Sequence, residues 1–145
     1  MKFRKAQKED IPKLFDILKE NNPKYAKALA LRELEEMFSN ALVRPTYIVA
    51  EDKNSIVAFG GFIPSWADHC VFNIFWINTA QAHERLGIGS RLLDNMINRI
   101  KKIKAIKAQL ILISTRIPAY YYRFGFKRVT SKYDGDYVLM SLALR

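Results

Sequence analysis

Chemistry is first suggested by the segment Arg85-Leu86-Gly87-Ile88-Gly89-Ser90, where two closely spaced glycines open a strongly patterned helical stretch. Glycine lets the backbone take positive φ and approach a ligand closely. The first N–H groups of a helix have no partner within the helix, and they carry the positive end of its dipole. The segment therefore predicts an anion cradle that would hold a phosphate group.

Two better-known phosphate loops do not fit these residues. A dinucleotide fingerprint would need a third glycine near Leu92 and an acidic residue roughly 20 positions later, where the chain has a lysine-rich run. A nucleotide-triphosphate loop would need a lysine directly before Ser90, where the chain has Gly89. A plain strand-to-helix turn with no ligand remains the alternative to a cradle.

Composition limits the class of protein. The chain has 145 residues, of which 50% are hydrophobic and 26% charged, as expected for one folded domain over residues 1–145. Cys70 is the only cysteine, so an internal disulfide and a cysteine-built zinc site are excluded, and we expect no metal. A lone cysteine and the lack of a spanning apolar run predict a cytoplasmic protein without a membrane partner.

The chain is strongly basic. Twenty-four Lys and Arg against fourteen Asp and Glu give a net charge of +10, which attracts polyanions as a class, from nucleic acids to phosphate-bearing cofactors. The densest basic run, residues 99–107, alternates with apolar residues and so favours the solvated face of a helix.

In the first half of the chain, the pattern predicts an edge strand, two helices and a hairpin. Residues 1–7 form the strand, Asp10 caps the first helix, and the second helix covers residues 24–38. The hairpin pairs residues 46–51 with residues 55–63. Gly60-Gly61 indicates a bulge or close packing in its second strand.

In the second half, residues 70–79 read as a central strand that leads into the glycine turn. An amphipathic helix follows, and residues 109–114 then form a buried strand. A short helix stopped by Gly125 comes next. Residues 126–133 and 137–144 are expected to close the fold as a hairpin.

Together, the order of elements and two marker segments resemble the GNAT N-acetyltransferase superfamily. The first marker is Glu84-Arg85-Leu86-Gly87-Ile88-Gly89, at the place of the family's Gln/Arg-x-x-Gly-x-Gly/Ala signature. The second is Tyr121-Tyr122-Arg123-Phe124-Gly125-Phe126, at its Tyr-x-x-x-Gly-Phe segment. The resemblance spans nearly the whole chain, and it implies an α/β fold with a central mixed, mostly antiparallel sheet flanked by helices. It also implies transfer of an acetyl group from acetyl-CoA to a primary amine.

The resemblance also implies a binding site. Backbone amides would hold the pyrophosphate of coenzyme A, and they come from Arg85, Leu86, Gly87, Ile88, Gly89 and Ser90. The side chains of Arg85 and Arg91 would either add contacts or lie on the surface. The pantetheine arm would pair with the backbone of Ile77 and Thr79, and the Ser114 N–H would bind the carbonyl oxygen as it gains negative charge.

Proton transfer is only partly assigned. Tyr121 matches the family's tyrosine, which would protonate the departing thiolate, and this role is favoured over the alternative of a core aromatic. No base is located, because the central strand offers only Asn73 and Asn78, with Asp68 and His69 at its start.

Some residues depart from the family pattern and leave other functions open. Glu84 would repel a pyrophosphate unless it were turned outward or paired.

Rival functions are an acyl-CoA-binding module with weak catalysis and, less favoured, a basic nucleic-acid-binding domain. The acceptor would be shaped by the loops at residues 21–25, 64–68 and 133–136. The oligomeric state stays open, a homodimer included.

Overall fold

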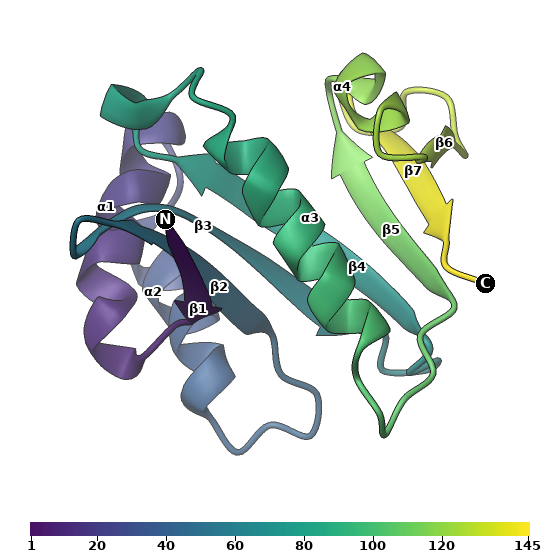
Figure 1. Ribbon diagram of the computed structural model, residues 1–145, viewed down its shortest axis with the longest axis horizontal. Coiled ribbons are helices and arrows are strands. Elements are labelled where there is room, and N and C mark those ends of the chain that lie inside the picture. Colours follow the sequence, from purple (N-terminus) through teal and green to yellow (C-terminus); the bar gives the residue numbers. More distant parts are fainter.

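A seven-stranded sheet in the order β1-β2-β3-β4-β5-β7-β6 runs through the computed structural model, which describes residues 1–145 (Figure 1). Every neighbouring pair of strands is antiparallel except β4 and β5. The strands are β1 (Lys2–Lys5), β2 (Thr46–Asp52), β3 (Ser55–Pro64), β4 (Val71–Thr79), β5 (Leu110–Thr115), β6 (Lys127–Arg128) and β7 (Val138–Ala143). The helices are α1 (Ile11–Asn21), α2 (Lys27–Glu35), α3 (Ile88–Lys101) and α4 (Pro118–Tyr122). The predicted mixed, mostly antiparallel sheet is confirmed.

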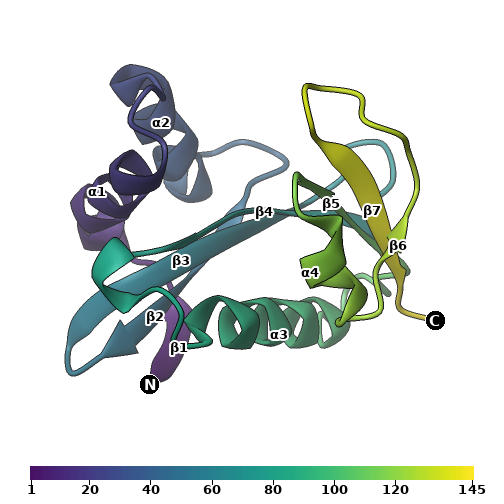
Figure 2. The ribbon, with the colours of Figure 1, turned by 90° about the horizontal axis from the view of Figure 1, so that it is seen from above.

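Helices cover both faces of the sheet. Figure 2 shows α1 and α2 on one face and α3 and α4 on the other. A core of 20 buried residues lies under α3, built on the apolar stripe that includes Leu92, Met96 and Ile100. A second core of 11 buried residues lies under α1 and α2. Because side chains alternate along a strand, the core that a strand residue joins tells which face it occupies. None of the helices has both the length and the apolarity needed to cross a bilayer.

Two adjacent glycines let both layers pack closely against β3. A Cβ on Gly60 would lie 2.7 Å from the Met96 Cε of α3, on one face. A Cβ on Gly61 would lie 2.7 Å from Phe75 Cζ and 2.9 Å from Tyr47 Cε1, on the other face. The expected close packing is therefore present, and the bulge lies in the neighbouring strand β4.

Replacing Gly61 with alanine is expected to destabilise the fold by about 1 to 3 kcal/mol, the usual cost of overpacking a core. The Tyr47 ring cannot yield easily, because it is buried and its hydroxyl donates to the Glu33 carbonyl oxygen at 2.8 Å. Gly60→Ala is the matched control, since its nearest neighbour is the flexible end of Met96. Urea unfolding of both variants measures the difference, and an equal loss in the two would contradict this account.

Strand β4 contains a bulge close to the place where it separates from β5. Phe59 pairs with Asn78 and Gly61 with Phe75, so Trp76 and Ile77 together face Gly60. Trp76 takes a φ of 54°, a left-handed conformation that is rare for a bulky side chain. Beyond the pair Asn73–Leu112, the ladder between β4 and β5 ends, and the two strands separate toward their carboxyl ends. The ladder therefore ends a few residues before the bulge, and the added residue strengthens the local twist in the part of β4 that has already left β5.

The first helix begins where the sequence predicted, with Asp10 at the N-cap position of α1, but the Asp10 side chain makes no capping hydrogen bond to the helix. A 3-10 turn over Lys8–Asp10 precedes the helix. The Asp10 carboxylate instead accepts the Gln7 N–H at 2.7 Å and pairs with Arg4, which also pairs with Glu51. Burial alone would raise the pKa of Asp10, but these hydrogen bonds outweigh it and lower the pKa. The carboxylate therefore ties the first turn to β1 and β2, a contact that the local sequence does not reveal.

The last hairpin differs from the prediction. Its first strand is only Lys127–Arg128 rather than residues 126–133. Arg128 pairs with Met140 while Asp134 pairs with Tyr137, so the two registers differ by three residues, and the segment between them must loop out. The Thr130 hydroxyl accepts the Leu139 N–H at 2.9 Å in place of a ladder bond. Figure 2 shows this connection rising on the face of the sheet that carries α1 and α2.

Candidate functional site

A cleft of about 730 Å³ lies where β4 and β5 separate. Its walls come from the carboxyl-terminal halves of both strands, the end of α1, the first residues after β5, and α4. Among its lining residues are Trp76 and Ile77 of the bulge and Tyr121 of α4. The separation of β4 from β5 thus opens a cleft whose lining reaches Glu84, the residue directly before the predicted cradle.

The predicted cradle lies at the amino end of α3. No backbone N–H from Arg85 to Ser90 donates to an acceptor within the protein. The first helical bond is from Arg91 N–H to Gly87 O at 3.2 Å. Arg85 and Gly87 both take left-handed φ, at 65° and 77°, which curves this run of amides into a concave loop. The stretch therefore has the unpaired donors that an anion site requires.

Gly89 brings the cradle against the end of β4. A Cβ on Gly89 would lie 3.7 Å from Thr79 Oγ1 and 3.9 Å from both Ile77 Cγ2 and the Tyr120 hydroxyl. These are ordinary contacts, so the backbone of α3 approaches β4 and α4 without strain there. The cradle, the two predicted β4 residues and α4 thus meet in one place.

Beside the predicted cradle lies a polar cluster, which the sequence did not predict. The Ser90 and Tyr120 hydroxyls lie 2.6 Å apart, and the Arg123 guanidinium lies 4.7 Å from the centre of the Tyr120 ring. Arg123 also donates to Ser90 Oγ at 3.4 Å. Arg91, by contrast, lies over the Phe3 ring on the β1 side. The cation held beside the cradle is therefore Arg123, which only the folding of α4 onto α3 places there.

The backbone N–H and C=O groups of Thr79 point away from β3. Ala80 N–H donates to Val57 O, so hydrogen-bonded pairs alternate along the ladder and Thr79 falls between two of them. Its carbonyl oxygen accepts the Asn21 Nδ2–H at 3.0 Å. The carboxyl end of α1 is thereby fixed to the strand that borders the cleft.

Ser114 is oriented by a similar alternation. Leu144 N–H donates to Gln109 O, so Ile111, Ile113 and Thr115 make the bonded pairs with β7. The backbone groups of Ser114 therefore point toward β4, beyond the last ladder pair, into the cleft. Its hydroxyl lies 2.6 Å from that of Tyr133, which comes from the looped-out segment before β7.

Tyr121 lines the cleft and is otherwise buried, with its ring edge-on to Tyr120 and Phe126. Burial, and then the nearby Tyr120, raise the pKa of Tyr121 to about 12. The phenol hence stays protonated at neutral pH. Its burial agrees with the interpretation as a core aromatic, and its role as a proton donor stays a prediction.

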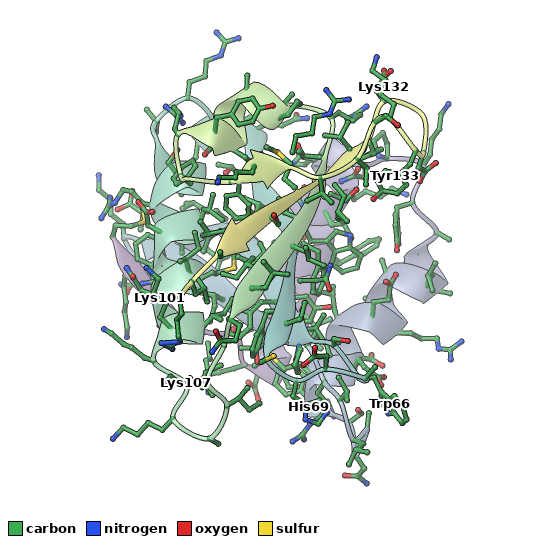
Figure 3. The ribbon with its side chains drawn as sticks, turned by 90° about the vertical axis from the view of Figure 1, so that its right-hand side faces the viewer. Trp66, His69, Lys101, Lys107, Lys132 and Tyr133 are labelled. Atoms are coloured by element: carbon green, nitrogen blue, oxygen red, sulfur yellow. The ribbon has the colours of Figure 1, made fainter.

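The acidic residues considered from sequence do not gather at the cleft. Asp68 and His69 precede β4, at the opposite end from the bulge, where Pro64 lines a separate groove (Figure 3). Asp136 is exposed and pairs with Lys132 at 3.3 Å. Glu84 is exposed, contributes to the lining of the cleft and makes no ion pair.

A mixed sheet with a splayed parallel pair beside a helix-end anion cradle defines the class of acyl-CoA-dependent acyltransferases. Residues 44–128 match the acetyltransferase (GNAT) domain family. The chain therefore belongs to the GNAT acetyltransferase family. No curated protein matches the sequence.

Solved structures show the same fold at low sequence identity. The aminoglycoside 6'-N-acetyltransferase from Enterococcus faecium has a TM-score of 0.78 at 15% identity, over 99% of this chain and 97% of that one. Ribosomal-protein-alanine N-acetyltransferase from Brucella melitensis has a TM-score of 0.79 at 15% identity, over 99% and 100%. A GNAT family acetyltransferase from Brucella melitensis in complex with acetyl-CoA has a TM-score of 0.72 at 19% identity, over 99% and 88%.

Proposed function

We propose that this chain transfers an acetyl group from acetyl-CoA to a primary amine by direct attack with both substrates bound. The observation that carries the proposal is the run of unpaired amides from Arg85 to Ser90 next to the β4–β5 cleft. Family membership and the acetyl-CoA complex of a structural neighbour support the same donor.

The residues present fit this donor. The amides from Arg85 to Ser90 would bind the pyrophosphate, with Arg123 beside them supplying positive charge. The pantetheine arm would lie along β4, where the Thr79 N–H points away from β3. Ile77, on the α3 face of the bulge, would form the apolar wall of this channel.

Acetyl-CoA supplies the activated acetyl group, and the protein positions it and moves protons. The amine nitrogen forms a bond to the carbonyl carbon, and the carbon–sulfur bond breaks. The Ser114 N–H would donate to the carbonyl oxygen as negative charge grows on it. The Tyr121 hydroxyl would protonate the leaving sulfur, and the proton lost by the amine passes to water, because no carboxylate lies beside Asn73 or Asn78 in the cleft.

Calorimetric titration with acetyl-CoA, followed by a thiol-release assay with a panel of primary amines, tests the proposal. We expect saturable acetyl-CoA binding and amine-dependent release of coenzyme A. Absence of both would refute it. Binding without release from any amine would instead support the binding-module alternative, which the lack of a carboxylate beside Asn73 and Asn78 favours.

A further inference from the structure

The cleft has two sides that belong to opposite faces of the sheet. Ile111, Ile113 and Val138 join the core under α3, so the alternating side chain of Ser114 lies on the face that carries α1 and α2. Arg116 directly follows β5 and lies over the ring of Tyr137, which directly precedes β7. Both line the cleft together with Asn21 and Asn22 at the end of α1. The cradle and Tyr120 lie on the α3 face. A donor bound at the cradle therefore leaves the α1–α2 side of the cleft for the acceptor.

Arg116 is the only cation that lines this cleft. Its guanidinium carbon lies 5.5 Å from the centre of the Tyr137 ring, which holds the side chain against β7. None of its N–H groups donates to a protein acceptor, and it forms no ion pair. Arginine presents a planar fork of donors that matches a carboxylate or phosphate.

The rest of the acceptor side is polar without being acidic. Asn21, Asn22, Asn73 and Asn78 supply carboxamides, and Trp76 and Phe75 supply apolar surface. The one carboxylate in the lining is Glu84, which precedes the cradle at the donor end. The exposed Asp134 and Asp136 follow Lys132 on the outer loop, where Asp136 pairs with it.

We propose that the acceptor is an amine that also carries an anionic group, a carboxylate or a phosphate, and that Arg116 binds this anion. The proposal rests on the acetyltransferase function proposed above. A polycationic acceptor would meet an unneutralised arginine and a chain of net charge +10, with no acidic wall to bind it. The aminoglycoside acetyltransferases thus share this fold but not the acceptor charge that we infer.

Matched amines test the inference at saturating acetyl-CoA. The pairs are β-alanine with β-alaninamide and phosphoethanolamine with ethanolamine, and 1,4-diaminobutane and an aminoglycoside serve as cations. We expect kcat/KM to favour the anionic member of at least one pair by about tenfold. A preference within the β-alanine pair would identify the anionic group as a carboxylate, and a preference within the phosphoethanolamine pair would identify it as a phosphate.

Three variants assign the preference to Arg116. Arg116→Gln should bring the anion-to-neutral ratio close to one, and Arg116→Glu should favour 1,4-diaminobutane. Lys107→Gln, which removes the same charge at the opposite end of the molecule from Lys132 and Tyr133, should leave the ratio unchanged (Figure 3). Acetyl-CoA affinity should be the same in all three.

A cation preferred by the wild type, or an unchanged ratio in Arg116→Gln, would overturn the inference while acetyl transfer itself persists. Failure to bind acetyl-CoA, or binding without acetylation of any amine in the panel, would overturn the proposed function and the inference with it. The two failures are therefore distinguishable by whether any amine is acetylated.

Discussion

Tyr121→Phe is expected to lower kcat about 100-fold, at the lower end of what a positioned proton donor contributes. The KM for acetyl-CoA should change little, because the substitution removes one hydroxyl and leaves the ring packed against Phe126. Stopped-flow or continuous thiol-release assays at saturating substrates measure kcat directly.

The pH dependence separates a proton donor from a packing role. Because burial holds the pKa of Tyr121 at about 12, its phenol stays protonated throughout the range from pH 6 to 10. We therefore expect kcat/KM to rise with pH as the acceptor amine loses its proton, with no fall from ionisation of Tyr121. The deficit of Tyr121→Phe should be constant across this range.

Tyr120→Phe is the matched control. It removes a neighbouring hydroxyl that contacts Ser90 beside the cradle, so it should raise the KM for acetyl-CoA and leave kcat near the wild-type value. Wild-type kcat in Tyr121→Phe, or equal losses of kcat in the two variants, would show that Tyr121 acts only in packing.

Gly89→Asp is expected to weaken acetyl-CoA binding about 100-fold or more while the protein stays folded. The φ of Gly89 is not in the left-handed region, and a Cβ there makes only ordinary contacts, so the fold tolerates a side chain. The new carboxylate would stand among the amides that we propose bind the pyrophosphate, where like charges repel. Calorimetry measures affinity, and thermal unfolding verifies that Tm is retained.

Two further variants test the charge and the backbone conformation beside Gly89 separately. Glu84→Gln removes a carboxylate from the cleft lining and should tighten acetyl-CoA binding. Gly87→Ala faces open space but has a φ of 77°, so it should cost about 1 kcal/mol of stability with a smaller loss of affinity. If Gly89→Asp bound acetyl-CoA as tightly as the wild type, the pyrophosphate would have to bind elsewhere.

The sequence by itself determined the elements and the family. The apolar stripe of α3, the turn at residues 52–54 and the glycines before α3 are local patterns, and each directly constrains backbone conformation. The order of those elements with the two marker segments was enough to predict the sheet. It did not reveal that the Asp10 carboxylate pairs with Arg4 instead of capping the helix with its side chain. It also missed the irregular course of residues 129–133, where the Thr130 hydroxyl accepts the Leu139 N–H.

Only the tertiary structure decided what surrounds the acetyl-transfer site. The bulge falls at Trp76, where no glycine marks it, because Trp76 packs edge-on to Tyr25 and stacks on Tyr47 under α1 and α2. That bulge accompanies the separation of β4 from β5 and sets which face each later side chain occupies. Arg116 and Arg123 look alike in the sequence. Arg116 lines the cleft because it follows the end of β5 and lies over the Tyr137 ring. Arg123 lies beside the predicted cradle because α4 docks onto the start of α3.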